Sequence, residues 1–178
     1  PEVLKTLDGA EIISGPDAAR VRCLTYLNGN LFADYLRPGS EALRSAGRAV
    51  GTLDAALAEF DHPAAARPDM AWDIVGARRI AQHVNLIPDA ALRRLADFAF
   101  LKFENEVEEV LFALPKQVCH NDGHRFSLIC SGTEKEPCVS GVIDFGDITS
   151  THRVCNLSVT VSDLIVGQTE LIEAASLI

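Results

Sequence analysis

The chain has 178 residues, 48% of them hydrophobic and 23% charged, which is the composition of one globular domain or one large lobe of a bigger protein. Its formal net charge is −9, from 16 basic and 25 acidic residues without a basic run, so we expect no nucleic-acid partner. No stretch approaches the ~20 apolar residues that cross a bilayer and no signal peptide is visible, so we expect no membrane partner and a cytoplasmic location.

The first part of the sequence predicts short strands. The stretch "VLKTLDGAEIISG" (3–15) reads as two strands around a turn at residues 7–9, and "VRCLTYLNGN" (21–30) as a further strand that ends at Asn28-Gly29. Because the chain begins at Pro1 instead of a methionine, we expect it to be a fragment of a longer protein.

Helical periodicity begins after Pro38. A helix is predicted from Ser40, its N-cap, with one apolar stripe formed by Leu43, Ala46, Val50, Leu53, Leu57 and Phe60. Residues 61–70 predict a loop and 71–84 a shorter helix. Asp89 is expected to cap a long helix through Leu114, whose inward side chains are Leu92, Leu95, Phe98, Val107, Val110 and Leu111.

After Pro115 the helical periodicity gives way to short apolar runs. Two apolar runs, 126–130 and 138–143, flank the polar turn "SGTEKEP" (131–137) and predict a β-hairpin. Residues 151–167 predict a helix with Val154, Leu157, Val161 and Leu164 on one stripe, and a further helix follows. Strands, helices, a hairpin and helices in that order indicate an α+β fold. The five cysteines lack the spacing of a zinc site and are expected to be mostly buried, reduced thiols.

Two acidic residues stand at the two ends of the predicted hairpin. Asp122 precedes its first arm in "VCHNDGHRFSLIC" (118–130), and Asp144 follows its second arm in "GVIDFGD" (141–147). Antiparallel pairing would bring both carboxylates together. In phosphoryl transfer one carboxylate accepts the proton of the hydroxyl nucleophile and a second holds Mg²⁺ against the phosphates. The alternative is that both are solvated turn residues.

The paired stretches "HNDGHRFSLIC" and "GVIDFGD" resemble the catalytic and metal-binding segments of the aminoglycoside phosphotransferase and choline kinase superfamily. "VRCLTYLNGN" resembles the strand that links the two lobes, and "FDHPAAARPDMAWDI" (60–74) resembles the hydroxylysine-kinase-like branch, which also occurs fused to class III aminotransferases. The resemblance implies a protein-kinase-like fold, with residues 1–37 as the remnant of an N-terminal lobe and residues 38–178 as a helical C-terminal lobe.

The resemblance also implies roles for individual residues. Asp122 matches the catalytic base, His120 the residue that braces the catalytic loop, Asp144 the metal ligand, and Asp147 the end of the same motif. The hinge, defined as the segment that links the lobes and faces the adenine, corresponds to Thr25, Tyr26 and Leu27.

Departures from the family pattern leave two hypotheses. Ser127 stands where the family has a metal-binding Asn and is a weaker Mg²⁺ ligand, Asn156 stands where an Asp is common, and the glycine-rich strands and their Lys are absent upstream. The first hypothesis is a kinase that transfers phosphate from ATP or GTP, with Mg²⁺, to a small amino alcohol or amino acid. The second is a binding or regulatory module that has lost turnover.

Two further residues have alternative roles. His124 is expected to be either a phosphate contact or a solvated loop residue, and Asp73 is expected to be either a substrate-amine partner or a helix cap.

Overall fold

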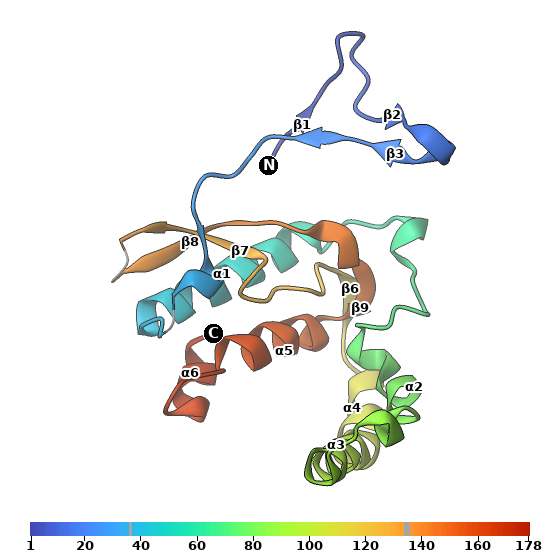
Figure 1. The fold of residues 1–178 in the computed structure, drawn as a ribbon, viewed down its shortest axis with the longest axis vertical. Coiled ribbons are helices and arrows are strands. Elements are labelled where there is room, and N and C mark those ends of the chain that lie inside the picture. The colour runs from blue at the N-terminus through green and yellow to red at the C-terminus, as the bar shows by residue number, and fades with distance from the viewer. Residues whose placement is uncertain (36, 134–135) are drawn as a thin grey trace.

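Helices and short antiparallel strands alternate along the chain in the computed structural model, which describes residues 1–35, 37–133 and 136–178 (Figure 1). The helices are α1 (Ser40–Leu57), α2 (Ala77–Ala81), α3 (Ala90–Lys102), α4 (Glu108–Phe112), α5 (Arg153–Leu164) and α6 (Leu171–Leu177). The strands are β1 (Val3–Leu4), β2 (Ile13–Ser14), β3 (Arg20–Val21), β4 (Cys23–Leu24), β5 (Asn30–Leu31), β6 (Lys116–Cys119), β7 (Leu128–Gly132), β8 (Pro137–Val142) and β9 (Thr149–His152). This mixture confirms the predicted α+β class.

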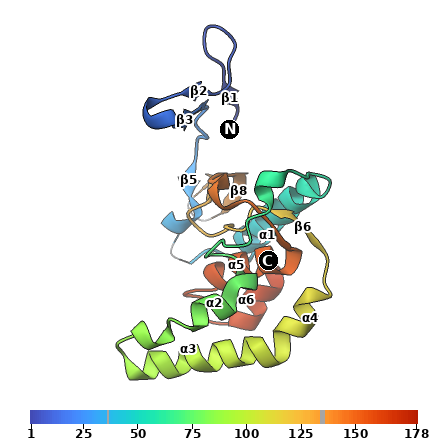
Figure 2. The same cartoon turned by 90° about the vertical axis from the view of Figure 1, so that its right-hand side faces the viewer.

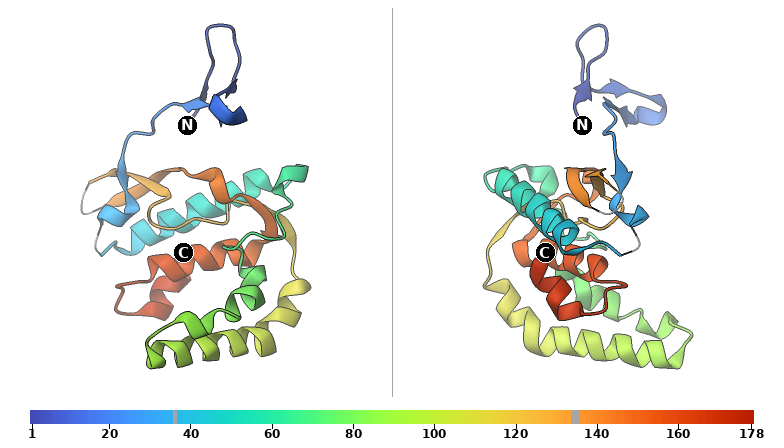
Figure 3. Two further views of the ribbon diagram at one scale, coloured as in Figure 1. Left: turned by 45° about the vertical axis from the view of Figure 1, so that its right-hand side comes forward. Right: turned by 90° about the vertical axis from the view of Figure 1, so that its left-hand side faces the viewer.

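The N-terminal strands form a small layer that stands apart from the helices (Figure 3). The prediction of two strands around residues 7–9 is confirmed, but their partners differ from a simple hairpin. β1 pairs with β4 and β2 pairs with β3, so both strands lie against the continuous stretch 20–24. The turn between them is closed by bonds between Thr6 and Ala10.

The predicted hairpin is confirmed. β7 pairs with β8 in antiparallel register from Leu128↔Val142 to Gly132↔Pro137, with an irregularity at Ile129 and Cys130. Glu134 and Lys135 of the predicted polar turn lie outside the described residues. β5 adds a third strand through pairing with β7, so residues 30–31 already belong to this sheet. The division at residue 37 stays a prediction.

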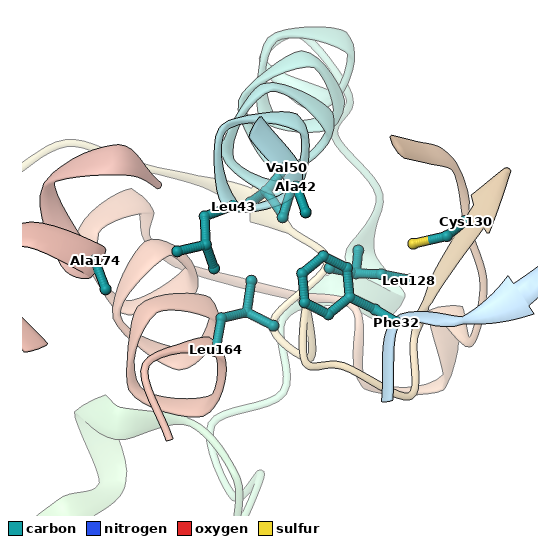
Figure 4. Close-up of a cluster of buried hydrophobic side chains, with 9 residues drawn as sticks. Phe32, Ala42, Leu43, Val50, Leu128, Cys130, Leu164 and Ala174 are labelled. Carbon is teal, nitrogen blue, oxygen red and sulfur yellow. The ribbon is translucent and has the colours of Figure 1, made fainter. Parts of the chain in front are cut away.

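The central core lies between α1, the hairpin and α5 (Figure 4). Its buried members are Phe32, Ala42, Leu43, Ala46, Val50, Leu128, Cys130, Leu164 and Ala174. The α1 stripe was therefore predicted correctly at positions 43, 46 and 50. The N-cap of α1 is Gly39, and Ser40 is its first helical residue, which corrects the predicted cap by one position.

The segment after Asp89 is helical, but it is interrupted and largely exposed. The carboxylate of Asp89 accepts bonds from the backbone N–H groups of Ala91 and Leu92, as a cap should. A π-helical turn at Phe103–Val107 separates α3 from α4. Of the side chains predicted to face inward only Leu111 is buried, and the prediction was wrong for Leu92, Leu95, Phe98, Val107 and Val110. Figure 2 shows α3 and α4 along one edge of the molecule, with α2 beside α3 and this face uncovered by the described chain.

The remaining elements join the hairpin to the helices. β6 pairs with β9 from Lys116↔His152 to Cys119↔Thr149, so the predicted helix from residue 151 begins two residues later as α5. Its predicted stripe was wrong at Val154 and Leu157, which are exposed. The buried face of α5 instead carries Cys155, Asn156, Thr160 and Leu164. The polar side chains of Asn156 and Thr160 can be buried there because both form hydrogen bonds inside the protein.

The predicted helix at 71–84 is shorter than expected. A 3₁₀ turn at Ile74–Gly76 leads into α2, and the Asp73 carboxylate accepts the Val75 N–H at 3.1 Å, which confirms Asp73 as a cap. The cysteines differ in burial: Cys119, Cys130 and Cys155 are buried, whereas Cys23 and Cys138 are exposed. Among the described residues, every helix is too short or too polar to traverse a bilayer.

Candidate active site

One imidazole connects the two loops that carry the predicted acidic pair. His120 follows β6 and is buried. Its Nδ1 accepts the backbone N–H of Asp122 at 3.3 Å, and its Nε2 lies 2.9 Å from the carbonyl oxygen of Ile143, the residue before Asp144. A neutral imidazole with its proton on Nε2 satisfies both contacts. His120 thereby fixes the position of one acidic loop relative to the other.

Burial keeps His120 in this neutral state. Desolvation is the main cause that lowers the pKa of His120 below its ordinary value, and the bond to the Ile143 carbonyl opposes it. The ring also packs edge-on against Phe145, with centroids 4.8 Å apart. The bracing role predicted for His120 agrees with this geometry.

Asp122 is a half-buried carboxylate with other acids close by. Burial is the main cause that raises its pKa above the ordinary value, and the negative charges of Asp147 and Asp144 add to the rise, while His124 and His120 oppose it. The Nε2 atom of His124 lies 3.7 Å from Asp122 Oδ1. A carboxylate with a raised pKa is a stronger proton acceptor than a solvated one.

Asp144 sits at the start of an exposed turn. Its backbone is left-handed, with φ of 62°, and its Oδ1 accepts the Gly146 N–H at 3.3 Å. From the other side, Arg67 donates to the carbonyl oxygens of Gly146 and Ile148, at 2.7 and 3.3 Å. The role of Arg67 was missed from the sequence, where nothing marks a loop arginine as a partner of residue 146.

The loop that carries Asp122 is anchored to α5. The backbone N–H of Asn121 donates to Asn156 Oδ1 at 2.8 Å, and Asn156 Nδ2 donates to the buried carboxylate of Asp54 at 2.8 Å. Arg125 adds a second anchor through bonds from its backbone N–H and its Nε to the Asp163 carboxylate, at 2.7 and 3.0 Å. Asp54 was missed, although it lies four residues after Val50 on the buried stripe of α1 and could have been recognised there.

Ser127 is buried within the same loop. Its hydroxyl oxygen lies 2.9 Å from His124 Nδ1, and its side chain has no exposed surface. His124 therefore lies between Asp122 and Ser127, which places it in the loop instead of free in solvent. The metal-ligand role of Ser127 stays a prediction, and in the structure its hydroxyl is committed to His124.

The predicted hinge lines a cavity that opens beside Asp144. The cavity has a volume of about 550 Å³, and its walls are formed by Pro1, Arg22, Leu24, Thr25, Tyr26, Leu27, Gly29, Leu31, Ile129, Ile143, Asp144, Phe145 and Gly146. Thr25 is tied to the N-terminus, since its N–H donates to the Glu2 carbonyl and its hydroxyl accepts the Glu2 N–H. Mostly apolar walls that end at a carboxylate suit a ligand with a flat apolar part and a charged part.

The acidic residues fit Mg²⁺ only together with a phosphate ligand. In the described part of the chain, no three His, Cys, Asp or Glu side chains form a closed metal set. Mg²⁺ is typically held by one or two carboxylates, with waters and substrate phosphates completing its shell. Burial is the main cause that raises the pKa of Asp122, and the negative charges of Asp147 and Asp144 add to it; a cation bound near these acids would offset the repulsive part.

The Asp144 turn lines the hinge cavity, and His120 joins this turn to the loop that carries Asp122. A family model described as "Phosphotransferase enzyme family" matches residues 1–176, and the chain belongs to this family, whose fold is protein-kinase-like.

Similar curated proteins indicate which branch of the family the chain resembles. The chain is similar to hydroxylysine kinase of Mus musculus, with 24% identity over 168 residues that cover 90% of this chain and 44% of the relative. It is also similar to hydroxylysine kinase of Danio rerio, with 23% identity over 89% of this chain and 45% of the relative. The same name belongs to a Xenopus laevis relative, with 23% identity over 96% of this chain and 47% of the relative. The chain thus spans about half the length of the curated relatives it matches.

Proposed function

We propose that this chain is part of a small-molecule kinase. It transfers the γ-phosphate of ATP or GTP to a hydroxyl group of a small amino-bearing acceptor, either an amino alcohol or an amino acid such as hydroxylysine. The family assignment supports phosphoryl transfer, and the similarity to hydroxylysine kinases supports the acceptor class.

The single observation that carries the proposal is the bridge formed by His120. It joins the Asp122 backbone to the residue before Asp144, and this link between the two acidic loops supports the proposal that they serve one site. Two unrelated turn residues would need no buried imidazole between them. Phosphoryl transfer needs such a pair, since the protein contributes mainly positioning and charge stabilisation.

In the proposed mechanism Asp122 accepts the proton of the acceptor hydroxyl as that oxygen attacks the phosphate. Its half-buried position strengthens it as a base, and the bond from the Asp122 N–H to His120 fixes its direction. Asp144 would hold Mg²⁺, which neutralises charge on the phosphates. Arg67 keeps the Asp144 turn in place through the Gly146 carbonyl.

The hinge cavity is the proposed nucleotide site. The base would lie against Leu24, Leu27 and Ile129, and its phosphates would extend toward Asp144, which lines the same cavity. A volume of about 550 Å³ lies within the ~300–1,000 Å³ typical of small-molecule sites.

Phosphate transfer to hydroxylysine and to simple amino alcohols, from ATP and from GTP, tests this function in the protein expressed from its complete reading frame. Asp122→Asn is expected to lower turnover by about 10²–10⁴-fold with little change in nucleotide affinity, because it removes the base and keeps the shape. Asp97→Asn, at an exposed position of α3, is the matched control. Unchanged turnover in Asp122→Asn would refute the assignment of the base.

A catalytically degenerate binding or regulatory module is the second candidate, and the buried hydroxyl of Ser127 favours it. That hydroxyl is committed to His124, so the position offers less to a metal than an Asn side chain would. Nucleotide binding without phosphate transfer to any acceptor would support the module. Transfer that depends on Asp122 would exclude it.

Three further parts of the proposal concern the whole protein. We assign residues 1–37 to the remnant of an N-terminal lobe and residues 38–178 to the C-terminal lobe. We also propose a cytoplasmic location and a fused or associated aminotransferase. Limited proteolysis near residue 37 tests the division into two lobes. Localisation of the tagged protein tests the cytoplasmic location, and the complete reading frame tests for a fused aminotransferase.

A further inference from the structure

A second cavity is lined in part by Arg67, the residue that donates to the Gly146 carbonyl of the Asp144 turn. It has a volume of about 380 Å³ and is lined by Ala66, Arg67, Pro68, Asp73, Val75, Gly76, Arg79, Lys116 and Ser150. We name it the Lys116 pocket. Two bonds hold its walls together, from Thr149 to the Ala65 carbonyl at 3.1 Å and from Thr151 to Asp73 at 2.8 Å. These bonds fix the segment 65–79 against β9, as the neighbouring ribbons in Figure 1 show.

Three cationic side chains line the Lys116 pocket in a chain whose net charge is −9. Across the residues that the structure describes, no carboxylate lies within ion-pair distance of Arg67, Arg79 or Lys116. Arg67 and Arg79 donate to backbone carbonyls, which leave their charges uncompensated. Cations that line one cavity without anionic partners suit a carboxylate or phosphate group.

One acidic group faces the same cavity. The Asp73 carboxylate accepts the Thr151 hydroxyl and the Val75 N–H through Oδ1, and both bonds fix its position. Cations on several walls and one fixed carboxylate match the charges of a free amino acid, with the carboxylate near Lys116 and Arg79 and an ammonium group near Asp73.

The Lys116 pocket and the hinge cavity meet at the same turn. Arg67 lines the pocket and donates to the carbonyl of Gly146, while Gly146 itself lines the hinge cavity. An acceptor held in the pocket and a nucleotide held at the hinge would therefore both lie next to the Asp144 turn. Phosphate transfer needs donor and acceptor close together in this way.

We infer that the Lys116 pocket binds the carboxylate of an amino-acid acceptor, and this inference rests on the proposed kinase function. It selects amino acids over amino alcohols within the acceptor class. Lys116 and Arg79 are specificity-determining residues, because they reach the carboxylate while the reacting hydroxyl lies elsewhere. Arg67 also positions the Asp144 turn, so it is unsuitable for a selective test.

Binding measured by calorimetry without nucleotide tests the pocket independently of turnover. The probes are hydroxylysine and its carboxamide, which lacks the negative charge. Lys116→Gln and Arg79→Gln are each expected to weaken hydroxylysine binding at least about tenfold, a loss typical of a charged hydrogen-bond partner. The carboxamide should bind weakly and equally to wild type and variants. Arg94→Gln, which alters an exposed arginine of α3 outside the pocket, is the matched control.

Both variants change exposed side chains, and their unfolding midpoints are measured alongside to confirm folding. Equal affinity for the acid and the amide, unchanged affinity in both variants, or no binding of either probe would overturn the pocket.

Kinetics separate this inference from the proposed function. If both stand, the variants raise KM for hydroxylysine and leave kcat and the KM for nucleotide nearly unchanged. Charge-dependent binding without phosphate transfer would keep the pocket and refute the kinase. Transfer with the same KM for acid and amide would keep the kinase and refute the pocket.

Discussion

Asn156 donates a hydrogen bond from Nδ2 to Asp54 Oδ1 across 2.8 Å, although the two residues are 102 positions apart in the sequence. Its other amide atom, Oδ1, accepts the N–H of Asn121 in the loop that carries Asp122. Because a carboxylate only accepts, Asp54 fixes which way the Asn156 amide points and so leaves its oxygen for the loop. A buried charge on α1 thus orients the backbone next to the proposed base.

Asn156→Asp is expected to make stability depend on pH. It places two buried carboxylates in contact, and one of them must hold a proton. The pair would have a raised folded-state pKa, so the free energy of unfolding should fall as pH rises through that pKa, by as much as about 3–5 kcal/mol. Burial already raises the pKa of Asp54 in the wild type, so the same trend, but weaker, is expected there.

The double variant Asp54→Asn with Asn156→Asp is the control for this prediction. It restores one donor and one acceptor between the two positions, and the steep pH dependence should disappear. Urea unfolding from about pH 5 to about pH 8 measures all three proteins. An Asn156→Asp protein that is as stable as wild type at every pH would contradict the orienting role of Asp54.

His120→Gln is expected to lower both stability and turnover. Glutamine has an acceptor and a donor, but its amide can take the place of the ring Nε2 without placing its oxygen where Nδ1 stands, so one buried group loses its partner at a cost of about 1–3 kcal/mol. Turnover should fall more than nucleotide affinity, because the two acidic loops lose their common brace. Equal turnover in variant and wild type would show that the loops are positioned by other contacts.

The wild type should also lose stability in mild acid through His120. Its folded-state pKa lies below the ordinary value because of burial, so its neutral form stabilises the fold above about pH 6.5, and this contribution is lost as pH falls through the lowered pKa. Comparison of unfolding free energies at neutral pH and about pH 5 measures the effect. The loss of unfolding free energy between neutral pH and about pH 5 should be smaller in His120→Gln than in wild type. An equal loss in both proteins would mean that a group other than His120 causes the pH dependence.

Ser127→Ala distinguishes a metal ligand from a structural hydroxyl. If the hydroxyl serves only His124, the variant should lose about 1 kcal/mol of stability, and the Mg²⁺ concentration needed for half-maximal activity should stay the same. If the hydroxyl is a ligand, that concentration rises. Ser162→Ala, on an exposed part of α5, is the matched control.

Gly123→Ala is expected to destabilise the loop that carries Asp122. A Cβ atom at this position would lie 2.6 Å from Thr160 Oγ1, so the loop or α5 would have to move, at a cost of about 1–3 kcal/mol. Adding Thr160→Ala should recover part of the loss, because the next neighbour, in Val50, is 3.4 Å away. Thermal unfolding of the two variants measures the recovery, and additive losses would argue against this contact.

Local patterns predicted the hairpin well. The two apolar runs have the length and the turn residues of paired strands, so the pairing of β7 with β8 follows from neighbours in the sequence. The roles of Asp122 and Asp144 stay predictions. The brace at His120 was predicted from family resemblance, and its contacts agree. These features depend on segments that are close along the chain.

Contacts between distant segments could not be predicted in the same way. Periodicity grouped Leu95 and Phe98 on one face correctly, but it carries no information on whether another element covers that face. Likewise, the stripe of α5 was assigned to Val154 and Leu157 because hydrophobicity alone was counted. The buried face instead carries Asn156, whose partners lie 35 and 102 positions away.

The uncovered face of α3 has a practical consequence for handling the purified chain. Four hydrophobic side chains recur there at helical spacing and form a continuous hydrophobic strip. Each is between 56% and 63% exposed: Leu92, Leu95, Phe98 and Leu101. Such strips promote aggregation even when the net charge is far from zero. Concentrated samples should therefore precipitate through this strip, and lysine or glutamate at positions 95 and 98 is the first change to make before crystallisation.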